Sequence, residues 1–182
     1  MLTEADPPAL STGQAPETPE GLLARLSAMG ITARTTTHPP LHTVAESKAL
    51  RGSLPGAHAK NLFLRPKMPG PFLLVVLEED RSISVNALLR RLGVGRGQFA
   101  SEAELFAELG VRPGAVTPFG LVNAAPGRVR VVIDQALVEG VETVHFHPLV
   151  NTATIALAPA DLLRFLRALG HEPEVLDLTS EG

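Results

Sequence analysis

The sequence predicts a single α+β domain in which a mixed, mostly antiparallel sheet is surrounded by helices. Two observations lead to this class. Apolar residues follow a helical spacing in some segments and form short β-branched runs in others, without the regular strand–helix–strand rhythm of a parallel α/β protein. Several predicted strands also follow one another closely, which favours antiparallel pairing. The chain has 182 residues, enough to bury the core of one domain, and it shows no internal repeat.

Residues 1–18 are expected to form a disordered leader, and residues 19–182 the folded domain. The leader is rich in Pro and Ala and contains no Lys or Arg, so it lacks the charged start of a signal peptide. No apolar run in the chain reaches the length of a membrane span. We therefore expect a cytoplasmic protein that has no contact with a membrane. We also expect it to be a monomer.

The first part of the folded chain predicts a helix, a strand and a second, short helix. The first helix starts at Pro19 behind a threonine N-cap, carries a stripe of leucines and ends at Gly30. The β-branched run 32–37 predicts a strand, and the prolines that follow force an extended chain or a turn. Thr43 and Glu46 form a capping-box pattern at the start of the second helix.

The rest of the chain predicts a β-hairpin and then further helices and strands. The hairpin consists of strands 59–65 and 71–77, joined by a turn that contains Pro and Gly. Of the two helices that follow, one begins at Ser84 and is ended by glycines, and the next begins at a capping box on Ser101. Three strands, a helix and an edge strand complete the domain, at residues 129–133, 143–146, 152–157, 159–169 and 174–178.

Basic residues are concentrated in one part of the chain, although the whole chain carries a net charge of −3. Residues 47–101 contain nine Lys or Arg and three acidic residues, a local charge of +6, whereas the rest contains seven basic and sixteen acidic residues, or −9. A basic face on an acidic protein suits a small polyanionic feature such as the end of an RNA. The alternative is a solvated surface on which the charges mix in three dimensions.

The residue types that are missing limit the possible chemistry. The absence of cysteine excludes disulfides, thiolate catalysis and cysteine-ligated zinc. The chain also lacks the Gly-x-Ser-x-Gly elbow of an α/β-hydrolase and the His-Glu-x-x-His pattern of a zinc protease. We expect a site that uses no metal and no cofactor.

The first segment that could carry chemistry is residues 58–64. A lysine at the mouth of a strand, such as Lys60, can bind phosphate as a point charge, and Asn61 can hold an amine or a carbonyl. In an extended strand these two side chains point to opposite faces, unless the strand starts or bulges there. The alternative interpretation is an exposed lysine at the beginning of a hairpin.

Two further segments contain residues suited to a pocket. Glycine and proline punctuate residues 114–123, where the backbone could approach a ligand closely, although a structural turn has the same pattern. His145 and His147 would share one face of a continued strand, but no nearby carboxylate or cysteine completes a set of metal ligands. His147, which precedes a proline, fits better at a strand end beside a pocket, or as a half-buried histidine bonded to backbone.

These segments together resemble the YbaK/ProX family, the free-standing relatives of the editing domain of bacterial prolyl-tRNA synthetase. The likeness spans about residues 22–177, and its motifs occur in the order and spacing of the family. They are His38–Pro40, Pro55–Leu64, Thr117–Asn123 and Phe146–Asn151. The Lys-Asn pair and the Pro-Phe-Gly-Leu-x-Asn segment look most like the ProXp-ala branch, which hydrolyses alanyl-tRNA(Pro).

The resemblance implies a role for each matching position. Lys60 matches the essential lysine near the terminal adenosine, and Asn61 matches a residue that helps to hold the aminoacyl group. Gly114 belongs to a Gly-x-x-x-Pro loop whose backbone contacts the substrate, and His147 matches a histidine that shapes or gates the amino-acid pocket. These four are the expected catalytic residues. The expected substrate-binding residues are Thr117, Pro118, Phe119, Gly120, Asn123 and Asn151.

The expected function is trans-editing, the hydrolysis of the ester of mischarged Ala-tRNA(Pro) by a positioned water. Because this ester is already activated, positioning and backbone electrostatics can supply much of the barrier reduction. The expected partners are the acceptor end of the mischarged tRNA and prolyl-tRNA synthetase. Two alternatives stay open: a deacylase of the same fold acting on serine or cysteine, and a non-catalytic RNA- or DNA-binding module that uses the basic region.

Overall fold

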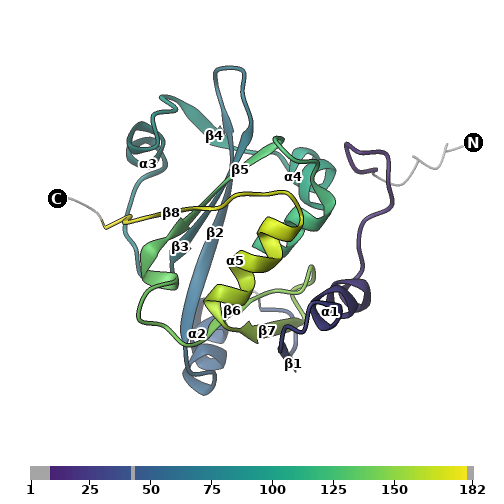
Figure 1. Cartoon of the computed structure of the whole chain (residues 1–182). Helices are drawn as coiled ribbons and strands as arrows, with labels where there is room; N and C mark the ends of the chain where they lie inside the picture. The colour runs from purple at the N-terminus through teal and green to yellow at the C-terminus, as the bar shows by residue number, and fades with distance from the viewer. Residues whose placement is uncertain (1–8, 42–43, 180–182) are drawn as a thin grey trace, which may run out of the picture.

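The computed structural model describes residues 9–41 and 44–179 (Figure 1). In this part of the chain, eight strands form one sheet in the order β1-β7-β6-β2-β3-β5-β8, with β4 pairing with β2 beside this path. The strands are β1 (Arg34–Thr37), β2 (Ala57–Pro66), β3 (Phe72–Glu78), β4 (Gly97–Phe99), β5 (Val129–Asp134), β6 (Val144–Phe146), β7 (Ala153–Leu157) and β8 (Glu174–Leu176).

The helices lie on both faces of this sheet. They are α1 (Pro19–Ala28), α2 (Val44–Ser53), α3 (Val85–Arg91), α4 (Glu102–Leu109), α5 (Pro159–Ala168) and the 3₁₀ helices η1 (Pro118–Asn123) and η2 (Gln135–Leu137). The predicted caps at Thr18 and Ser84 are confirmed, as is the capping box of Ser101 with Glu104. For the second helix, the predicted cap Thr43 lies outside the described residues.

The strand pairings confirm a mixed sheet. The predicted hairpin exists as the antiparallel pair β2–β3, and β2–β4, β1–β7 and β6–β7 are also antiparallel. The pairs β2–β6, β3–β5 and β5–β8 are parallel. The last strand, β8, lies at the edge of the sheet as predicted.

The central strands β2 and β3 separate two apolar clusters, because alternate side chains of a strand point to opposite faces. Phe63 and its cross-strand neighbour Leu74 join the larger cluster, which α1, α4 and α5 cover. Leu64 and its neighbour Leu73 join the smaller cluster, which α3 covers. Figure 1 shows β2 as the long strand that runs from α2 to the hairpin turn, spanning the molecule between the two layers.

The described part of the predicted leader differs from the expectation, because residues 9–18 pack onto the domain. Leu10 is 5% exposed and approaches Gly110 at the end of α4. The amide of Ser11 donates to the carbonyl of Ala107 at 2.7 Å, and the amide of Glu17 donates to the Asn123 side chain at 2.8 Å. A buried leucine and satisfied backbone amides hold this segment in place despite its Pro-rich composition.

The strand β4 was not predicted, because its sequence follows a run of glycines. In addition, none of the helices in the described part of the chain combines the length and the apolar character that crossing a bilayer requires.

Candidate active site

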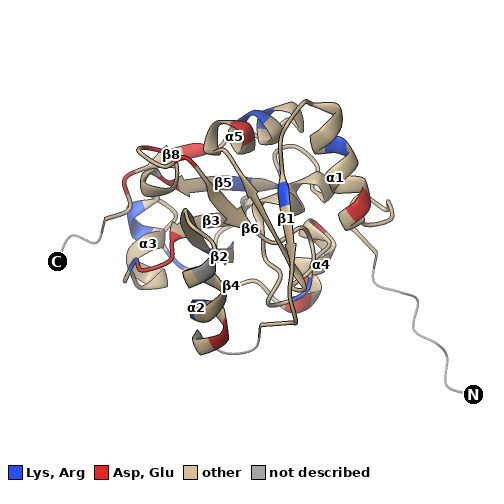
Figure 2. Cartoon of the chain, turned by 90° about the horizontal axis from the view of Figure 1, so that it is seen from below, with Lys and Arg blue, Asp and Glu red and all other residues tan. Residues whose placement is uncertain are grey.

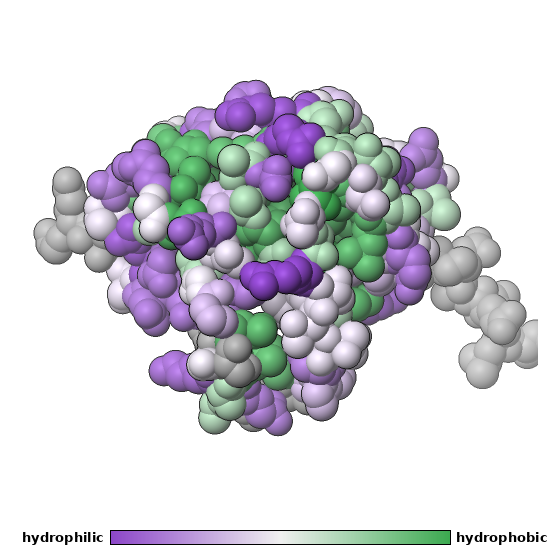
Figure 3. Space-filling model, turned by 60° about the horizontal axis from the view of Figure 1, so that its bottom comes forward, coloured by the Kyte–Doolittle hydropathy of each residue, from purple (hydrophilic) through white to green (hydrophobic). Residues whose placement is uncertain are grey.

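A cavity of about 550 Å³ lies where α2, the start of β2, the β3–α3 loop, β6 and β7 meet. Figure 2 views the molecule from this end, with α2 toward the viewer, and Figure 3 shows apolar and polar side chains mixed on this surface. The apolar lining consists of Leu41, Leu50, Leu54, Ala59 and Phe146, and the polar lining includes His58, Lys60, Asn61, Glu79, Asp80, Arg81, His145, His147 and Thr154.

An opening in the edge of β2 explains why two neighbouring residues can line one cavity. On this edge β2 pairs with β6 at Ala57 and His58 and with β4 only from Leu64 onward. The residues between, which include Lys60 and Asn61, have no paired strand on that side. Although the two side chains point to opposite faces of β2, both reach the cavity because it opens at this unpaired edge.

Lys60 is half-buried, and its ammonium donates to the backbone carbonyl of Arg81. The guanidinium of Arg81 in turn makes a bidentate pair with Asp134, at 2.8 Å from Nε to Oδ2 and 3.1 Å from Nη2 to Oδ1. This chain of contacts fixes the position of the lysine, and it leaves two of the three ammonium N–H donors available.

Asp134 is the buried end of this network. Its side chain is fully buried, and its carboxylate also accepts from the backbone amides of Glu78 and Ala136, each at 3.1 Å. Burial acts to raise the pKa of Asp134, but the bonds from Arg81 and the two amides outweigh it and lower the pKa below its ordinary value. The carboxylate therefore stays ionised at neutral pH and holds the β3–α3 loop.

Asn61 offers an open acceptor to the cavity. Its Oδ1 atom is buried and has no hydrogen-bond partner among the described residues. A buried polar atom without a partner costs about 1–3 kcal/mol, so such atoms point to a group that a ligand completes. An amide oxygen accepts from an ammonium, an amine or a hydroxyl.

His147 is held as a neutral acceptor. Its Nδ1 lies 2.8 Å from the carbonyl of Ala153, and because a carbonyl only accepts, Nδ1 carries the proton. Burial lowers the pKa of His147, and the nearby His38, whose ring centroid is 6.1 Å away, lowers it further. The neutral ring therefore leaves Nε2 as a hydrogen-bond acceptor in the wall of the cavity.

A stacked pair of histidines closes another side of the cavity. The rings of His58 and His145 lie 4.4 Å apart and nearly parallel, with an angle of 6°. The Nε2 of His58 donates to the carbonyl of Leu54 at 2.9 Å, and that of His145 donates to the carbonyl of Pro55 at 2.8 Å. The pair thus fixes the connection between α2 and β2 through the Nε2 atoms of both rings.

The predicted substrate-binding loop lies beside the cavity, and most of its side chains are buried. Thr117 and Phe119 are fully buried, and Phe119 packs edge-on against Phe146 and Phe165 in the larger apolar cluster. Pro118 is buried in η1, and a Cβ on Gly120 would lie 2.9 Å from the side chain of Leu109. None of these four residues is among those that line the cavity, and their direct contact with the substrate stays a prediction.

Three other predicted site residues also lie outside the cavity lining. Both ends of the Asn123 side-chain amide are bonded within the protein, since Nδ2 donates to the carbonyl of Leu109 at 2.9 Å and Oδ1 accepts from the amide of Glu17. Gly114 adopts a φ of +88°, which favours glycine, and a Cβ there would lie 3.7 Å from the Nδ2 of Asn151. The structure therefore brings Lys60, Asn61 and His147 together, and it places Gly114 next to Asn151.

Sequence reasoning missed the residues that position the lysine. Asp134 directly follows the predicted strand 129–133, and Arg81 precedes the predicted cap Ser84, so neither had a local pattern that marks a site. Their pairing across 53 positions depends on the parallel pair β3–β5, which brings the ends of these strands to the same edge. The one available signal was an acidic residue at the end of an apolar strand.

Comparisons with known proteins agree with this geometry. Residues 38–165 match the family described as aminoacyl-tRNA editing domain. Prolyl-tRNA synthetase associated domain-containing protein 1 of Bos taurus is 42% identical over 156 residues, covering 84% of this chain and 91% of the relative. Prolyl-tRNA editing protein ProX of Acetoanaerobium sticklandii is 33% identical, covering 87% and 96%. The multifunctional Ser/Thr-tRNA deacylase ProXp-y of Escherichia coli is 28% identical, covering 81% and 87%.

Proposed function

Because the chain belongs to the family of aminoacyl-tRNA editing domains, enzymes that hydrolyse the ester of mischarged tRNA, we propose that it removes alanine from tRNA(Pro). The observation that carries this proposal is the cavity at the start of β2, which combines a fixed lysine, an open amide acceptor and a neutral histidine with an apolar wall.

Lys60 binds the RNA end of the substrate in this mechanism. One of its N–H donors stays on the carbonyl of Arg81, and the other two are directed to the phosphate or ribose oxygens of the terminal adenosine. Since the Arg81–Asp134 pair holds that carbonyl, the ammonium is in position before the substrate arrives. Such preorganisation is the form of catalysis that an activated ester needs.

Asn61 and the rim of the cavity recognise the amino acid. The free α-ammonium of an aminoacyl ester is a cation, and the unpartnered Oδ1 of Asn61 supplies an acceptor for it. Glu79 and Asp80 also line the cavity and add negative potential near that ammonium. The apolar side, formed by leucines of α2 and its flanks, faces the short side chain of alanine.

His147 orients the water that attacks the ester carbonyl. Its Nδ1 donates to Ala153, so its Nε2 can accept a hydrogen bond from that water and hold one lone pair of the oxygen toward the carbonyl carbon. The water adds to the carbonyl, the bond to the ribose oxygen breaks, and the products are free alanine and the tRNA with its ribose hydroxyl restored. The ribose hydroxyl adjacent to the ester can carry the proton to the leaving oxygen.

Serine is the second candidate substrate, because the relative in Escherichia coli is described as a Ser/Thr-tRNA deacylase. An apolar pocket discriminates weakly against an added hydroxyl, by a factor of about 10². Proline is larger than alanine, and its side chain forms a ring with its own nitrogen. Steric exclusion from the pocket therefore protects the correctly charged tRNA(Pro).

The test is a panel of tRNA(Pro) charged with alanine, serine, cysteine or proline, incubated with the purified protein with and without a chelator. We expect alanine to be released fastest, proline to be retained, and the chelator to have no effect. Faster release of serine than of alanine would replace the proposed substrate by the second candidate. Salt-dependent binding without release of any amino acid would favour the non-catalytic module.

We also propose prolyl-tRNA synthetase as a partner, on the basis of the name of the bovine relative. Co-sedimentation of the two purified proteins in the presence of tRNA(Pro) tests this association, and separate sedimentation would contradict it.

A further inference from the structure

A second, larger cavity of about 1030 Å³ lies at the opposite end of β2 from the active site. It is bounded by the hairpin turn after β2, by α3 and by the segment that leads into β4, and we refer to it as the α3–β4 groove. Four basic residues line it, Arg65, Lys67, Arg90 and Arg96, and no acidic residue does. The α3–β4 groove therefore holds four of the nine basic residues that the sequence concentrates in residues 47–101.

Backbone contacts hold the walls of the α3–β4 groove close together. A Cβ on Gly97 would lie 2.7 Å from the carbonyl of Arg65 and 3.0 Å from the side chain of Leu89, so glycine lets β4 pack tightly between β2 and α3. The amide of Lys67 donates to the carbonyl of Arg96 at 2.8 Å, which ties the hairpin turn to the segment before β4. The basic side chains thus project from a rigid frame.

Most of these cations are not neutralised by the protein. Arg65 pairs with Glu104 at 3.2 Å, whereas Lys67, Arg90 and Arg96 take part in no ion pair among the described residues, and all are exposed. The adjacent Arg91 behaves differently, since its guanidinium donates to the carbonyls of Asp177 and Thr179. Unpaired cations that converge on one groove create a positive potential suited to a polyanion.

Exposed apolar side chains flank the same region. Among the described residues, the large apolar side chains with the greatest exposure are Met68 at 69% and Phe99 at 57%. Met68 lies in the hairpin turn next to Lys67, and Phe99 is the last residue of β4, next to Gln98 of the groove lining. An exposed aromatic ring is a surface on which a nucleic-acid base can stack.

The position of the α3–β4 groove relative to the active site fits one RNA strand. Both cavities lie along the edge of β2 that β6 and β4 share, and from Lys60 to Pro66 the strand rises about 20 Å. A stacked nucleic-acid strand advances about 3.4 Å per nucleotide, so this span corresponds to about six nucleotides. When the last nucleotide of such an RNA occupies the active site, the groove lies near the phosphates at the start of its double-stranded part.

We propose that the α3–β4 groove binds backbone phosphates of the tRNA acceptor arm while the aminoacylated 3′ end occupies the active site. This rests on the proposed function for the placement of the 3′ end, but the phosphate contacts themselves can be measured without hydrolysis. Since phosphates carry no sequence information, the groove supplies affinity that is common to all tRNAs, and the choice of amino acid is left to the active site.

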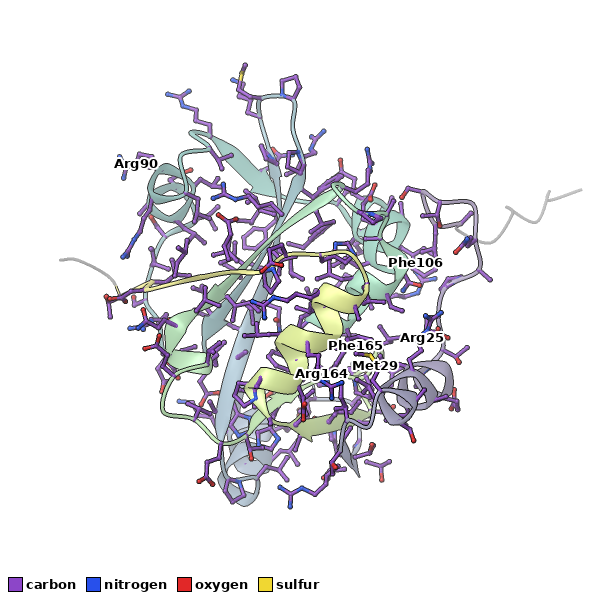
Figure 4. All side chains as sticks on the ribbon, in the orientation of Figure 1. Arg25, Met29, Arg90, Phe106, Arg164 and Phe165 are labelled. Carbon is purple, nitrogen blue, oxygen red and sulfur yellow. The ribbon has the colours of Figure 1, made fainter. Side chains whose placement is uncertain are left out.

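The test compares two double variants that lose the same charge. Arg90→Gln with Arg96→Gln removes two cations from the groove, whereas Arg25→Gln with Arg167→Gln removes two exposed cations from α1 and α5. Figure 4 shows Arg90 on α3 at the opposite side of the molecule from Arg25 on α1. Binding of uncharged tRNA(Pro) is measured by fluorescence anisotropy between 50 and 300 mM salt, and both variants are first checked for a wild-type circular dichroism spectrum and melting temperature.

We expect the groove variant to bind tRNA about tenfold more weakly at 100 mM salt. Its negative slope of log affinity against log salt should be shallower by about 2. The control variant should match the wild type. Equal affinities and slopes for the groove variant and the control would overturn the proposal, whether or not the protein is a deacylase.

A second arm separates this proposal from the proposed function. On alanyl-tRNA(Pro) the groove variant should have a raised KM, and this defect should disappear on alanyl-adenosine, which is too short to reach the groove. A defect of the same size on both substrates would contradict the proposal. A wild-type protein that binds tRNA through the groove and releases no alanine would refute the proposed function and leave the groove assignment standing.

Discussion

At the scale of single residues, the side chain of Asn61 is expected to lower the stability of the fold and to raise the activity. Replacing it by leucine removes a buried acceptor without a partner, so the free energy of unfolding should rise by about 1 kcal/mol. The same change removes the proposed contact to the α-ammonium and should lower kcat/KM by about 10–100-fold. Urea unfolding and deacylation of Ala-tRNA(Pro) measure the two effects.

Asn123 provides the contrast for this prediction, because both ends of its amide are bonded within the protein. Asn123→Leu should lower the free energy of unfolding by about 1–3 kcal/mol. If Asn61→Leu were also destabilising and left kcat/KM unchanged, the amide oxygen of Asn61 would have no role in the site.

The protonation of His147 should appear in the pH dependence of the reaction. Because burial holds its pKa below the ordinary value of 6.5, the ring is neutral at pH 7 and gains a proton only as the pH falls further. Protonation removes the acceptor at Nε2, so kcat/KM should be level down to pH 6.5 and should fall only at a lower pH. His147→Asn keeps a donor for the Ala153 carbonyl and should lower the rate and abolish this acid limb; an unchanged acid limb in the variant would assign it to another group.

Single residues also show what the sequence could and could not indicate. Lys60, Asn61 and His147 are expected site residues because of a resemblance in motif order. Physical reasoning on their segments alone also allows an ordinary exposed lysine and a half-buried histidine bonded to backbone. Phe119 belongs to another of the matching motifs, and its side chain is fully buried in the larger apolar cluster. A sequence motif does not distinguish a residue that touches a ligand from one that supports its neighbour.

At the scale of elements, the loop between β3 and α3 depends on Asp134. Replacing this buried carboxylate by alanine leaves the Arg81 guanidinium without its partner and should lower the free energy of unfolding by about 3–5 kcal/mol. Asp161→Ala removes a half-exposed carboxylate paired with Arg164 and should cost less than about 1 kcal/mol. Equal costs for the two variants would contradict the role given to the buried pair.

The carboxylate of Asp134 should also affect how the free energy of unfolding changes at acidic pH. Its pKa is lowered in the folded protein, so the folded state binds fewer protons than the unfolded state as the pH falls below about 4. The stability it contributes is therefore present above that pH and is lost as the pH drops through the folded value. Urea unfolding between pH 2.5 and 6 should show a smaller loss of stability in Asp134→Ala than in the wild type, and parallel curves would contradict this assignment.

The elements differ in how far they could be predicted. Helices with side-chain caps and the β2–β3 hairpin have local signals, and these were found. Strand β4 has none: its glycine normally ends an element, and here it is needed because β4 packs between α3 and β2. Such a strand exists through its tertiary neighbours, and a local pattern cannot indicate it.

At the scale of the whole molecule, the α+β class followed from apolar periodicity, but the parallel pairs β2–β6, β3–β5 and β5–β8 did not. Parallel strands are joined by long connections, so neither a turn signal nor a short spacing marks them. These pairings bring the end of β5 beside the β3–α3 loop and β6 beside the start of β2. The active site depends on both, which is why it could be recognised by resemblance and not assembled from the sequence.

Release of alanine from Ala-tRNA(Pro) by the wild-type protein, Lys60→Ala and Arg167→Ala tests the central claim most directly. Arg167 is an exposed cation on α5 whose loss matches the change of charge. Under single-turnover conditions the wild type and Arg167→Ala should release alanine at similar rates, and Lys60→Ala should be slower by at least about 10²-fold, because the proposed contact to the terminal adenosine is lost. Retention of alanine by the wild type, or equal rates for all three proteins, would contradict the claim that the cavity at the start of β2 is an editing site for alanyl-tRNA(Pro).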